Sequence, residues 1–314
     1  MNRTEYKEYF TQYLNTLPST KKSDKTISTY TGILTKFNNY LTYTLFDGKA
    51  EIEPITIVNY RTALYTSGVK SNTIRYDLTV LHTFFEWAVR MELIEKNPVE
   101  RREIPKEQQI EYDLLTLDEI KTVLTELPPK INRKTAIRNR AIVILLVQVG
   151  LRNSELRALT PADLDFENCC ITVKHGKGDK KRVVAFPKLA RELVKEYLNS
   201  NVRPINLTDK DLLFGTDADE NGHGTNGKIW KPITPQGLLK LVNRYTRLCC
   251  GHEVGVHSLR HAAASLWDDL GIGMRDIQNA LGHSSISTTE KVYVRVLNKV
   301  KTASKINTAL DSVI

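Results

Sequence analysis

A group of residues able to bind and attack an anion lies within residues 256–296. It consists of two imidazoles, a guanidinium, a further histidine and a phenol, namely His257, His283, Arg260, His261 and Tyr293. His257 and Arg260 are three residues apart and therefore share one face of a helix, which Gly255 and the alanines after His261 favour at this point. Because no carboxylate cluster lies nearby, phosphate is the most suitable ligand.

A second cation follows a segment that should be buried. Residues 139–150 are apolar on all sides, which predicts a central helix ending at Gly150. Arg152 follows at once, where a random surface charge is not expected. Glu155, three residues further on, could orient it.

A lysine is presented on a predicted hairpin. Residues 169–174 and 181–186 alternate in the manner of β-strands, and the glycine-flanked turn between them places Lys177 at its tip. The turn lacks the spacing of a nucleotide-binding phosphate loop. Lys177 could instead reach a substrate that is held elsewhere.

These groups suit transfer of a phosphodiester to tyrosine. Two arginines can grip the non-bridging oxygens, histidines donate hydrogen bonds, tyrosine supplies an oxygen nucleophile and lysine a proton for the leaving group. No acidic cluster is spaced for Mg²⁺, so the arginines would neutralise the transition state without metal or other cofactor. The candidate catalytic set is Arg152, Lys177, His257, Arg260, His283 and Tyr293.

The elements that must position these groups are mostly helical. Residues 1–103 predict a four-helix bundle, with helices over 5–17 and 23–46, one beginning near Thr56, and one over 72–91 with Ser71 or Asn72 as N-cap. Its aromatic stripes suit a core better than a base-stacking platform. Residues 104–112 are polar and predict an interdomain linker.

Residues 113–314 form the predicted second domain. A capping box of Thr116 and Glu119 opens it. Helices are expected over 187–199 and 234–250, and the tail 297–314 has helical spacing. The acidic, glycine-rich segment 215–227 predicts a loop in which His223 is exposed and is not a ligand. The chain is therefore expected to be mainly α with a small antiparallel β-sheet.

Composition points to a polyanionic partner. The net charge is +9, with 15 Lys and Arg against 13 Asp and Glu in residues 1–110 and 30 against 23 in 111–314. Simple solubility is the competing explanation for such a surplus. The chain lacks an apolar signal segment and an apolar run long enough to span a bilayer, so we expect a cytoplasmic protein. The four cysteines form two adjacent pairs, which suit apolar fillers in a reduced compartment.

Four segments, in this order, resemble the motifs of the phage integrase family, the tyrosine recombinases. Residues 150–156 (GLRNSEL) are similar to its first arginine motif, 257–261 (HSLRH) to its HxLRH motif, and 281–284 (LGHS) to its LGH motif. Residues 287–293 resemble the segment that carries its nucleophile. Any one of these motifs alone would be weak, but four in order are specific.

The resemblance implies a SAM-like, helical core-binding bundle followed by an α+β catalytic domain. It implies that Tyr293 attacks the scissile phosphate and forms a 3′-phosphotyrosyl link, with the other five candidates in the activating pocket. Glu155 and His261 would have supporting roles, with His261 bracing its helix. Lys180 and Lys181 are alternatives to Lys177 as the general acid.

The expected partner is double-stranded DNA carrying recombination sites. The resemblance further implies a homotetramer on synapsed DNA, joined through residues 297–314, with accessory DNA-bending proteins and no membrane. Such enzymes serve phages, transposons, plasmids and chromosomes, and the sequence does not choose among these hosts. Candidate phosphate contacts are Arg138, Arg140, Lys174, Lys180, Lys181, Arg182, Arg244 and Arg247.

Two other functions use the same residues. A topoisomerase-like nicking–closing enzyme would need the same pocket but no synaptic partner, and strand exchange between two duplexes distinguishes it from a recombinase. A DNA-binding regulator that has lost catalysis is the non-enzymatic alternative. The complete six-residue set disfavours that alternative.

Overall fold

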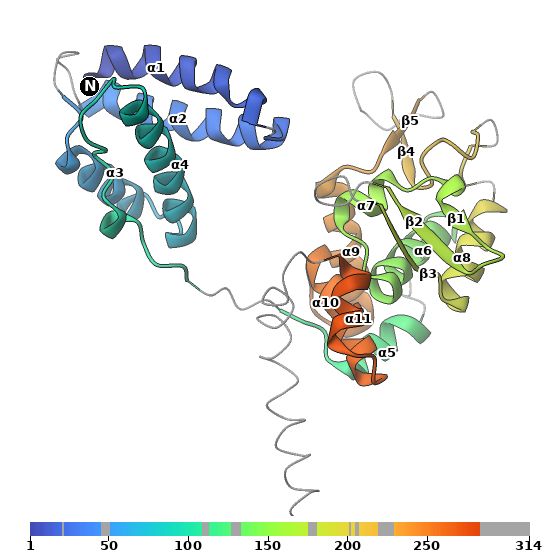
Figure 1. Cartoon of the computed structure of the whole chain (residues 1–314). Helices are drawn as coiled ribbons and strands as arrows, with labels where there is room; N and C mark the ends of the chain where they lie inside the picture. The colour runs from blue at the N-terminus through green and yellow to red at the C-terminus, as the bar shows by residue number, and fades with distance from the viewer. Residues whose placement is uncertain are drawn as a thin grey trace, which may run out of the picture. The chain divides into compact units, whose positions relative to one another are not determined.

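The chain forms two compact units, Met1–Glu111 and Tyr112–Ile314, which are described separately (Figure 1). In this computed structural model the described residues are 1–20, 22–44, 51–108, 113–126, 133–174, 181–200, 202–204, 207–218 and 229–282. The predicted C-terminal helix at 297–314 lies outside them, as do Lys177, Lys180, His223, His283 and Tyr293.

Unit 1 is the predicted helical bundle. Its α-helices are α1 (Arg3–Thr16), α2 (Asp24–Thr44), α3 (Pro54–Thr66) and α4 (Ser71–Arg90), with 3₁₀ turns at η1 (Pro18–Thr20) and η2 (Arg101–Glu103). The aromatic stripes meet in the core, where the Tyr6 ring lies edge-on to Phe37 and Phe84 at centroid distances of 5.4 and 5.2 Å. All three side chains are fully buried, which confirms that they form a core.

The start of α4 differs from the prediction. Lys70, not Ser71 or Asn72, occupies the N-cap position. The Asn72 amide instead pairs with the backbone of Gln108, donating from Nδ2 to the carbonyl oxygen at 2.7 Å and accepting from the backbone N–H at 2.8 Å. Arg61 similarly binds the Glu103 carboxylate. Residues 103–108, which include much of the predicted linker, are therefore tied to unit 1.

Unit 2 is built around a helix that is buried on all sides. Its helices are α5 (Leu117–Thr125), α6 (Arg133–Val149), α7 (Asn153–Ala158), η3 (Pro161–Asp163), α8 (Lys188–Leu198), α9 (Pro235–Cys250), α10 (Val256–Asp269) and α11 (Met274–Leu281). Residues 141–147 of α6 have no exposed surface, and α6 packs against α8 and α10. The predicted capping box opens α5, with the Thr116 N–H donating to Glu119 at 2.8 Å and the Glu119 N–H to the Thr116 hydroxyl at 3.2 Å.

Two small antiparallel sheets complete unit 2. Strands β1 (Leu164–Asp165), β2 (Cys170–Val173) and β3 (Arg182–Ala185) pair in that order, so the predicted hairpin is confirmed. Strands β4 (Gly215–Ala218) and β5 (Ile229–Pro232) form a second pair. The prediction of a loop beginning at Gly215 is wrong, because residues 215–218 hydrogen-bond to a strand beyond the glycine-rich segment.

The fold class is the predicted one, mainly helical with small antiparallel sheets. Each of the four cysteines is free and partly buried rather than fully enclosed. Within the part of the chain that the structure describes, no helix has both the length and the apolar character to cross a bilayer.

Candidate active site

Arg152 is placed by the junction between two helices. Gly150 ends α6 with a φ of +66°, which glycine adopts without the steric cost of a side chain. Arg152 is then the N-cap of α7. Its backbone N–H and its Nη1 both donate to the Glu155 carboxylate, each at 2.7 Å. The predicted orientation of Arg152 by Glu155 is thus present, and the Arg152 side chain remains 24% exposed.

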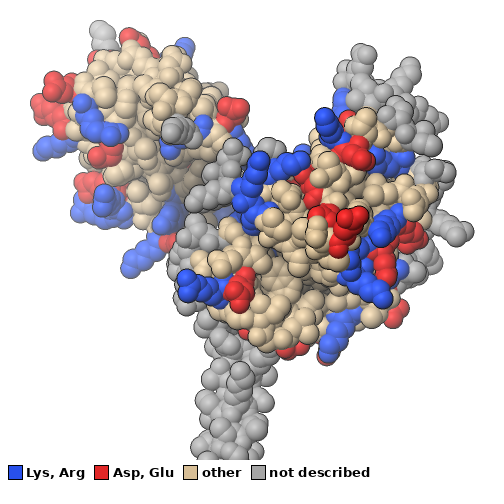
Figure 2. All heavy atoms as spheres, turned by 45° about the vertical axis from the view of Figure 1, so that its right-hand side comes forward, with Lys and Arg blue, Asp and Glu red and all other residues tan. Residues whose placement is uncertain are grey.

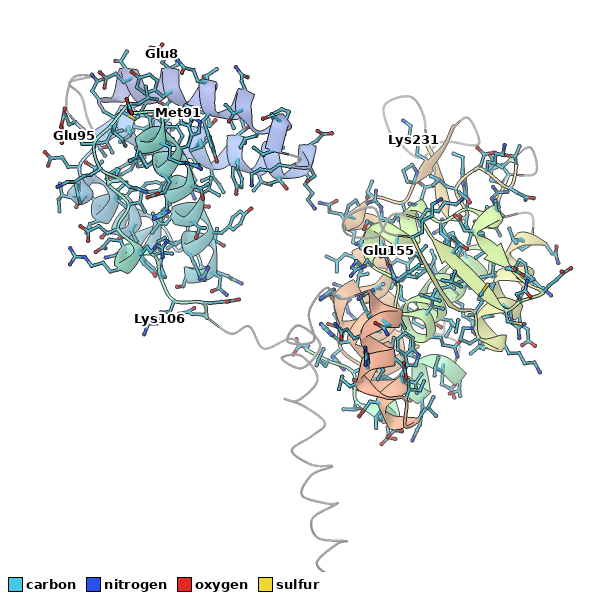
Figure 3. The ribbon with its side chains drawn as sticks, viewed as in Figure 1. Glu8, Met91, Glu95, Lys106, Glu155 and Lys231 are labelled. Carbon is cyan, nitrogen blue, oxygen red and sulfur yellow. The ribbon has the colours of Figure 1, made fainter. Side chains whose placement is uncertain are left out.

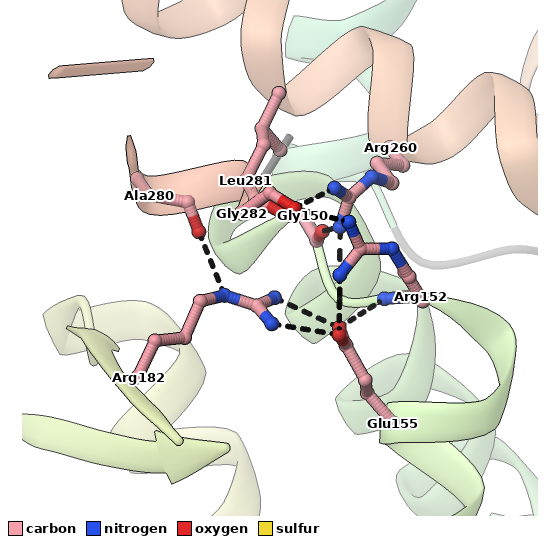
Figure 4. A network of polar contacts seen from close by, with 8 residues as sticks. All are labelled: Gly150, Arg152, Glu155, Arg182, Arg260, Ala280, Leu281 and Gly282. Atoms are coloured by element: carbon pink, nitrogen blue, oxygen red, sulfur yellow. Dashed lines mark hydrogen bonds and ion pairs between the residues drawn. The ribbon is translucent and has the colours of Figure 1, made fainter. Parts of the chain in front are cut away.

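Arg260 reaches the same junction from α10. Its guanidinium is 2% exposed and donates to the carbonyl oxygens of Gly150 and Leu281, so it joins the ends of α6 and α11. Its Nη1 lies 3.9 Å from Glu155 Oε2. Residues 108 positions apart in the chain therefore place two guanidiniums at one carboxylate (Figure 4).

Arg182 is a third cation at this carboxylate, although the sequence placed it among the DNA phosphate contacts. It donates from Nη1 and Nη2 to the two oxygens of Glu155 at 2.7 and 2.8 Å, and from Nε to the Ala280 carbonyl at 3.0 Å. Its side chain is 13% exposed, so it points into unit 2 rather than toward an external strand of DNA.

Glu155 is the buried centre of the network (Figures 3 and 4). Burial alone would raise the pKa of its carboxyl group. Hydrogen bonds and charge from Arg182, together with the N–H groups of Arg152, outweigh burial and lower this pKa to about 2. The carboxylate is therefore ionised at neutral pH and holds three guanidiniums close together, leaving a net positive charge for an anion.

His257 and His261 extend the site along α10. Their rings are perpendicular, with centroids 4.7 Å apart. His257 is exposed, whereas His261 is 8% exposed, as expected for a histidine that braces the helix. The partial enclosure of His257 and the positive charges of Arg260 and Arg152 lower its pKa. At neutral pH the His257 imidazole is therefore uncharged and can donate one hydrogen bond.

Gly282 brings the end of α11 into the same site. It caps the helix in the left-handed conformation with a φ of +65°, and its carbonyl oxygen accepts from Arg152 Nη2 at 2.5 Å. A Cβ at this position would lie 3.2 Å from the Arg182 side chain. The next residue is His283, which was predicted to act in this site and lies outside the described residues.

Three of the six catalytic candidates, Arg152, His257 and Arg260, lie in the described part and converge. The other three lie outside it. Sequence reasoning missed that Arg182 belongs to this group. Among the described residues no His, Cys, Asp and Glu side chains form a group of three that could hold a metal ion.

Several candidate phosphate contacts already have protein partners. Lys174 pairs with Asp163, and Arg247 with Glu253. Arg138 donates to the Asn139 side chain and to the Gly215 carbonyl. The Lys174 and Arg247 side chains are themselves 45% and 65% exposed, so a DNA phosphate can still reach them.

Three other candidates differ in exposure. Lys181 and Arg244 are exposed, whereas Arg140 is partly buried and its Nε is a buried atom without a hydrogen-bond partner. On the face seen in Figure 2, lysine and arginine side chains of unit 2 form several groups with acidic side chains among them.

Two family models match the chain. One described as the phage integrase family matches residues 113–299, and one described as the phage integrase N-terminal SAM-like domain matches residues 10–92. The expected combination of a SAM-like bundle and an integrase catalytic domain is thereby confirmed.

Relatives and solved structures agree with these matches. The chain is 31% identical to tyrosine recombinase XerA of Pyrococcus furiosus, over 95% of this chain and 91% of that one, and 30% identical to tyrosine recombinase XerC of Bacillus pumilus, over 86% of each. It superposes with a TM-score of 0.70 on XerH site-specific recombinase bound to a palindromic difH substrate, at 25% identity over 89% of this chain and 79% of that one. The Tn1549 transposon integrase in complex with transposon right end DNA superposes with a TM-score of 0.70 at 19% identity, over 98% of this chain and 100% of that one, and so shares the fold.

Proposed function

The chain belongs to the phage integrase family of tyrosine recombinases, and we propose that it is a site-specific DNA recombinase that cuts and rejoins duplex DNA through a covalent phosphotyrosyl intermediate. The observation that supports this most is the convergence of Arg152 and Arg260 on Glu155, with His257 beside them. This is a prearranged set of donors for a phosphodiester.

The proposed reaction has two transesterifications. The Tyr293 oxygen attacks phosphorus, a 3′-phosphotyrosyl bond forms, and the bond to the 5′ oxygen of the next nucleotide breaks. Lys177, or alternatively Lys180 or Lys181, protonates that oxygen. A 5′-hydroxyl from the partner strand then attacks the phosphotyrosine and releases Tyr293, so the bond energy is conserved and ATP is not needed.

Arg152 and Arg260 would stabilise the charge that grows on the non-bridging oxygens. The Arg260 guanidinium stays protonated at neutral pH, because burial and the neighbouring arginines lower its pKa only to about 9. His257 and His283 would donate further hydrogen bonds. Since arginines supply this stabilisation before the substrate arrives, we propose that cleavage requires no metal ion.

Duplex DNA is the proposed substrate, as the names of the DNA-bound structural neighbours suggest. We propose a homotetramer on two synapsed sites, with residues 297–314 joining neighbouring subunits and DNA-bending proteins assisting. We place the reaction in the cytoplasm. The exposed or exchangeable cations Arg138, Lys174, Lys181, Arg244 and Arg247 would bind the DNA backbone.

A nicked suicide substrate tests the nucleophile and the metal requirement together. The DNA comes from the ends of the genetic element that encodes the chain, and wild type and Tyr293→Phe are compared in chelator. We expect a covalent protein–DNA complex from wild type only, and recombinant product when two intact duplexes are supplied. Complex formation by Tyr293→Phe would mean that another residue attacks. Relaxation without strand exchange would indicate a nicking–closing enzyme, and binding without cleavage a regulator.

A further inference from the structure

Arg182 lies on the buried face of its strand. It begins β3, and because side chains alternate along a strand it shares a face with Val184, which is 4% exposed, while Val183 on the other face is 65% exposed. A guanidinium at a buried position requires hydrogen-bonding partners. All three of its nitrogen atoms have them, two at Glu155 and one at Ala280.

This fork holds Glu155 from the side opposite Arg152. Each carboxylate oxygen accepts one hydrogen bond from Arg182 and one from Arg152. The Glu155 side chain is 1% exposed, so water cannot replace a lost donor easily. The position of Arg152 therefore depends on a carboxylate whose own position depends on Arg182.

Arg182 also contacts the end of α11. Its Nε binds Ala280 and its aliphatic stem packs against Gly282, whose carbonyl oxygen in turn accepts from Arg152. One side chain thus connects β3 with the start of α7 and the end of α11, segments that are 27 and 98 residues away in the chain.

We propose that Arg182 is a positioning residue for phosphoryl transfer, which acts through Glu155 to fix Arg152 and does not itself contact the DNA. The inference rests on the proposed function, since it assigns Arg182 a part in that reaction. It replaces the phosphate contact predicted from sequence, because both terminal nitrogens of Arg182 bind the two oxygens of a buried carboxylate, whereas those of Arg260 hydrogen-bond to neutral carbonyl groups.

Two substitutions separate charge from geometry. Arg182→Met keeps an unbranched apolar stem and removes both charge and fork, and we expect single-turnover cleavage at saturating protein to slow by about ten- to a hundredfold, since small misplacements of a binding group cost that much. Arg182→Lys keeps the charge but cannot bind both oxygens, and it should restore part of the rate. Lys188→Met, which removes one exposed charge from α8, is the control and should stay within about twofold of wild type.

The same proteins are tested for DNA binding at several salt concentrations and for cleavage across pH. A positioning role predicts an unchanged salt dependence and an acid limb of the cleavage profile that moves to higher pH, because Glu155 loses its main stabilising partner. In a Glu155→Gln background, Arg182→Met should cost less than about threefold. A salt slope reduced by about one, with the rate restored at saturation, would instead identify a phosphate contact and overturn the proposal. If Arg182→Met slowed cleavage by the same factor in the Glu155→Gln background as in wild type, the proposal would be overturned as well.

Failure of the proposed function can be told apart from failure of this inference. If wild type forms no covalent complex on a DNA site that it binds, the recombinase proposal is wrong, and acid unfolding then decides the role of Arg182. An unfolding midpoint that Arg182→Met moves to higher pH only when Glu155 is present supports the coupling. An equal shift in the Glu155→Gln background contradicts it.

Discussion

At the scale of single residues, the site depends on one buried carboxylate among cations. Arg152, Arg182 and Arg260 all lie within 4 Å of Glu155, and the pKa of Arg260 is lowered by burial and by the other two arginines. The negative charge of Glu155 offsets part of the repulsion between these three guanidiniums. The guanidiniums can therefore remain close together before a phosphate arrives, which is the arrangement that electrostatic stabilisation of a transition state requires.

The stability of unit 2 should consequently fall in acid through Glu155. Its folded-state pKa is about 2, below the ordinary value of 4.5, so its stabilising contribution is complete above pH 4.5 and is lost as the pH falls toward 2. The shift corresponds to about 3 kcal/mol. Glu155→Gln should be less stable than wild type at pH 6, and the difference should shrink between pH 4.5 and 2.

Urea unfolding measured by tryptophan fluorescence tests this pH dependence. In a Trp87→Phe background the remaining tryptophans, Trp230 and Trp267, both report on unit 2. Glu192→Gln, at an exposed carboxylate on α8, is the matched control and should leave the acid profile unchanged. A difference between Glu155→Gln and wild type that stays constant from pH 6 to pH 2 would contradict the assigned pKa.

Local spacing allowed Arg152 and Glu155 to be linked from sequence, because they are three positions apart in the chain, as in a capping box. Arg182 was missed because its partners lie far along the chain. A signal was nevertheless present. In a strand whose alternate residues are Val184 and Phe186, a charged residue on the same face must be buried with a partner.

At the scale of elements, helix ends rather than helix centres build the site. The end of α6, the start of α7, the first turns of α10 and the end of α11 contribute Gly150, Arg152, His257 and Gly282. Carbonyl groups at helix C-termini lack partners within the helix, and here arginine side chains satisfy them. Two of these ends use glycines with positive φ, so the close approach of the elements depends on the absence of a side chain.

Gly150→Ala should therefore be more costly than the same change elsewhere. A Cβ there would lie 2.8 Å from Leu281 Cδ2 and 3.3 Å from Ala263 Cβ, so the buried Leu281 side chain would have to shift and the packing between the ends of α6 and α11 would change. Gly271 has a similar φ of +81° with open space around it and is the matched control. We expect Gly271→Ala to cost about 1 kcal/mol of unfolding free energy from backbone strain, and Gly150→Ala about 2 kcal/mol more.

Cleavage should separate the two glycine variants further. Gly150→Ala displaces the ends that hold Arg260, so its single-turnover rate should fall at least tenfold, while Gly271→Ala should cleave within about twofold of wild type. Unfolding in urea and suicide-substrate cleavage provide the two measurements. Equal losses of stability in both variants would show that packing at Gly150 does not hold the elements in place.

Most elements could be predicted because their patterns are local. Periodicity predicted the four α-helices α1 to α4 of unit 1, and alternation predicted β2 and β3. The errors arose where a distant segment decides the structure. The Asn72 side chain hydrogen-bonds to the backbone of Gln108 instead of capping α4. Residues 215–218 form a strand by pairing with residues 229–232. Neither partner can be identified from a short window of sequence.

At the scale of the whole molecule, the chain consists of two cores joined by one segment. The contacts that this segment makes with unit 1 decide how many of its residues connect the two units freely. The basic surplus belongs mainly to residues 111–314, which also contain the candidate site. The polar composition of 104–112 predicts a connection without a core of its own. It could not reveal that the Asn72 amide and the Arg61–Glu103 ion pair fasten the first part to unit 1.

Removing the Asn72 amide should lengthen the free connection without unfolding unit 1. Asn72 is only partly buried, so Asn72→Ala should cost about 1 kcal/mol or less for its two hydrogen bonds. The backbone around Lys106 would then fit a protease more readily, and we expect trypsin to cut after Lys106 several times faster under native conditions.

Mass spectrometry of the fragments measures this rate of cutting. Asn39→Ala, at an exposed asparagine on α2, is the control. Equal rates of cutting in Asn72→Ala and wild type would mean that Arg61 and Glu103 alone hold the segment, and faster cutting in the control as well would indicate general loosening of the bundle.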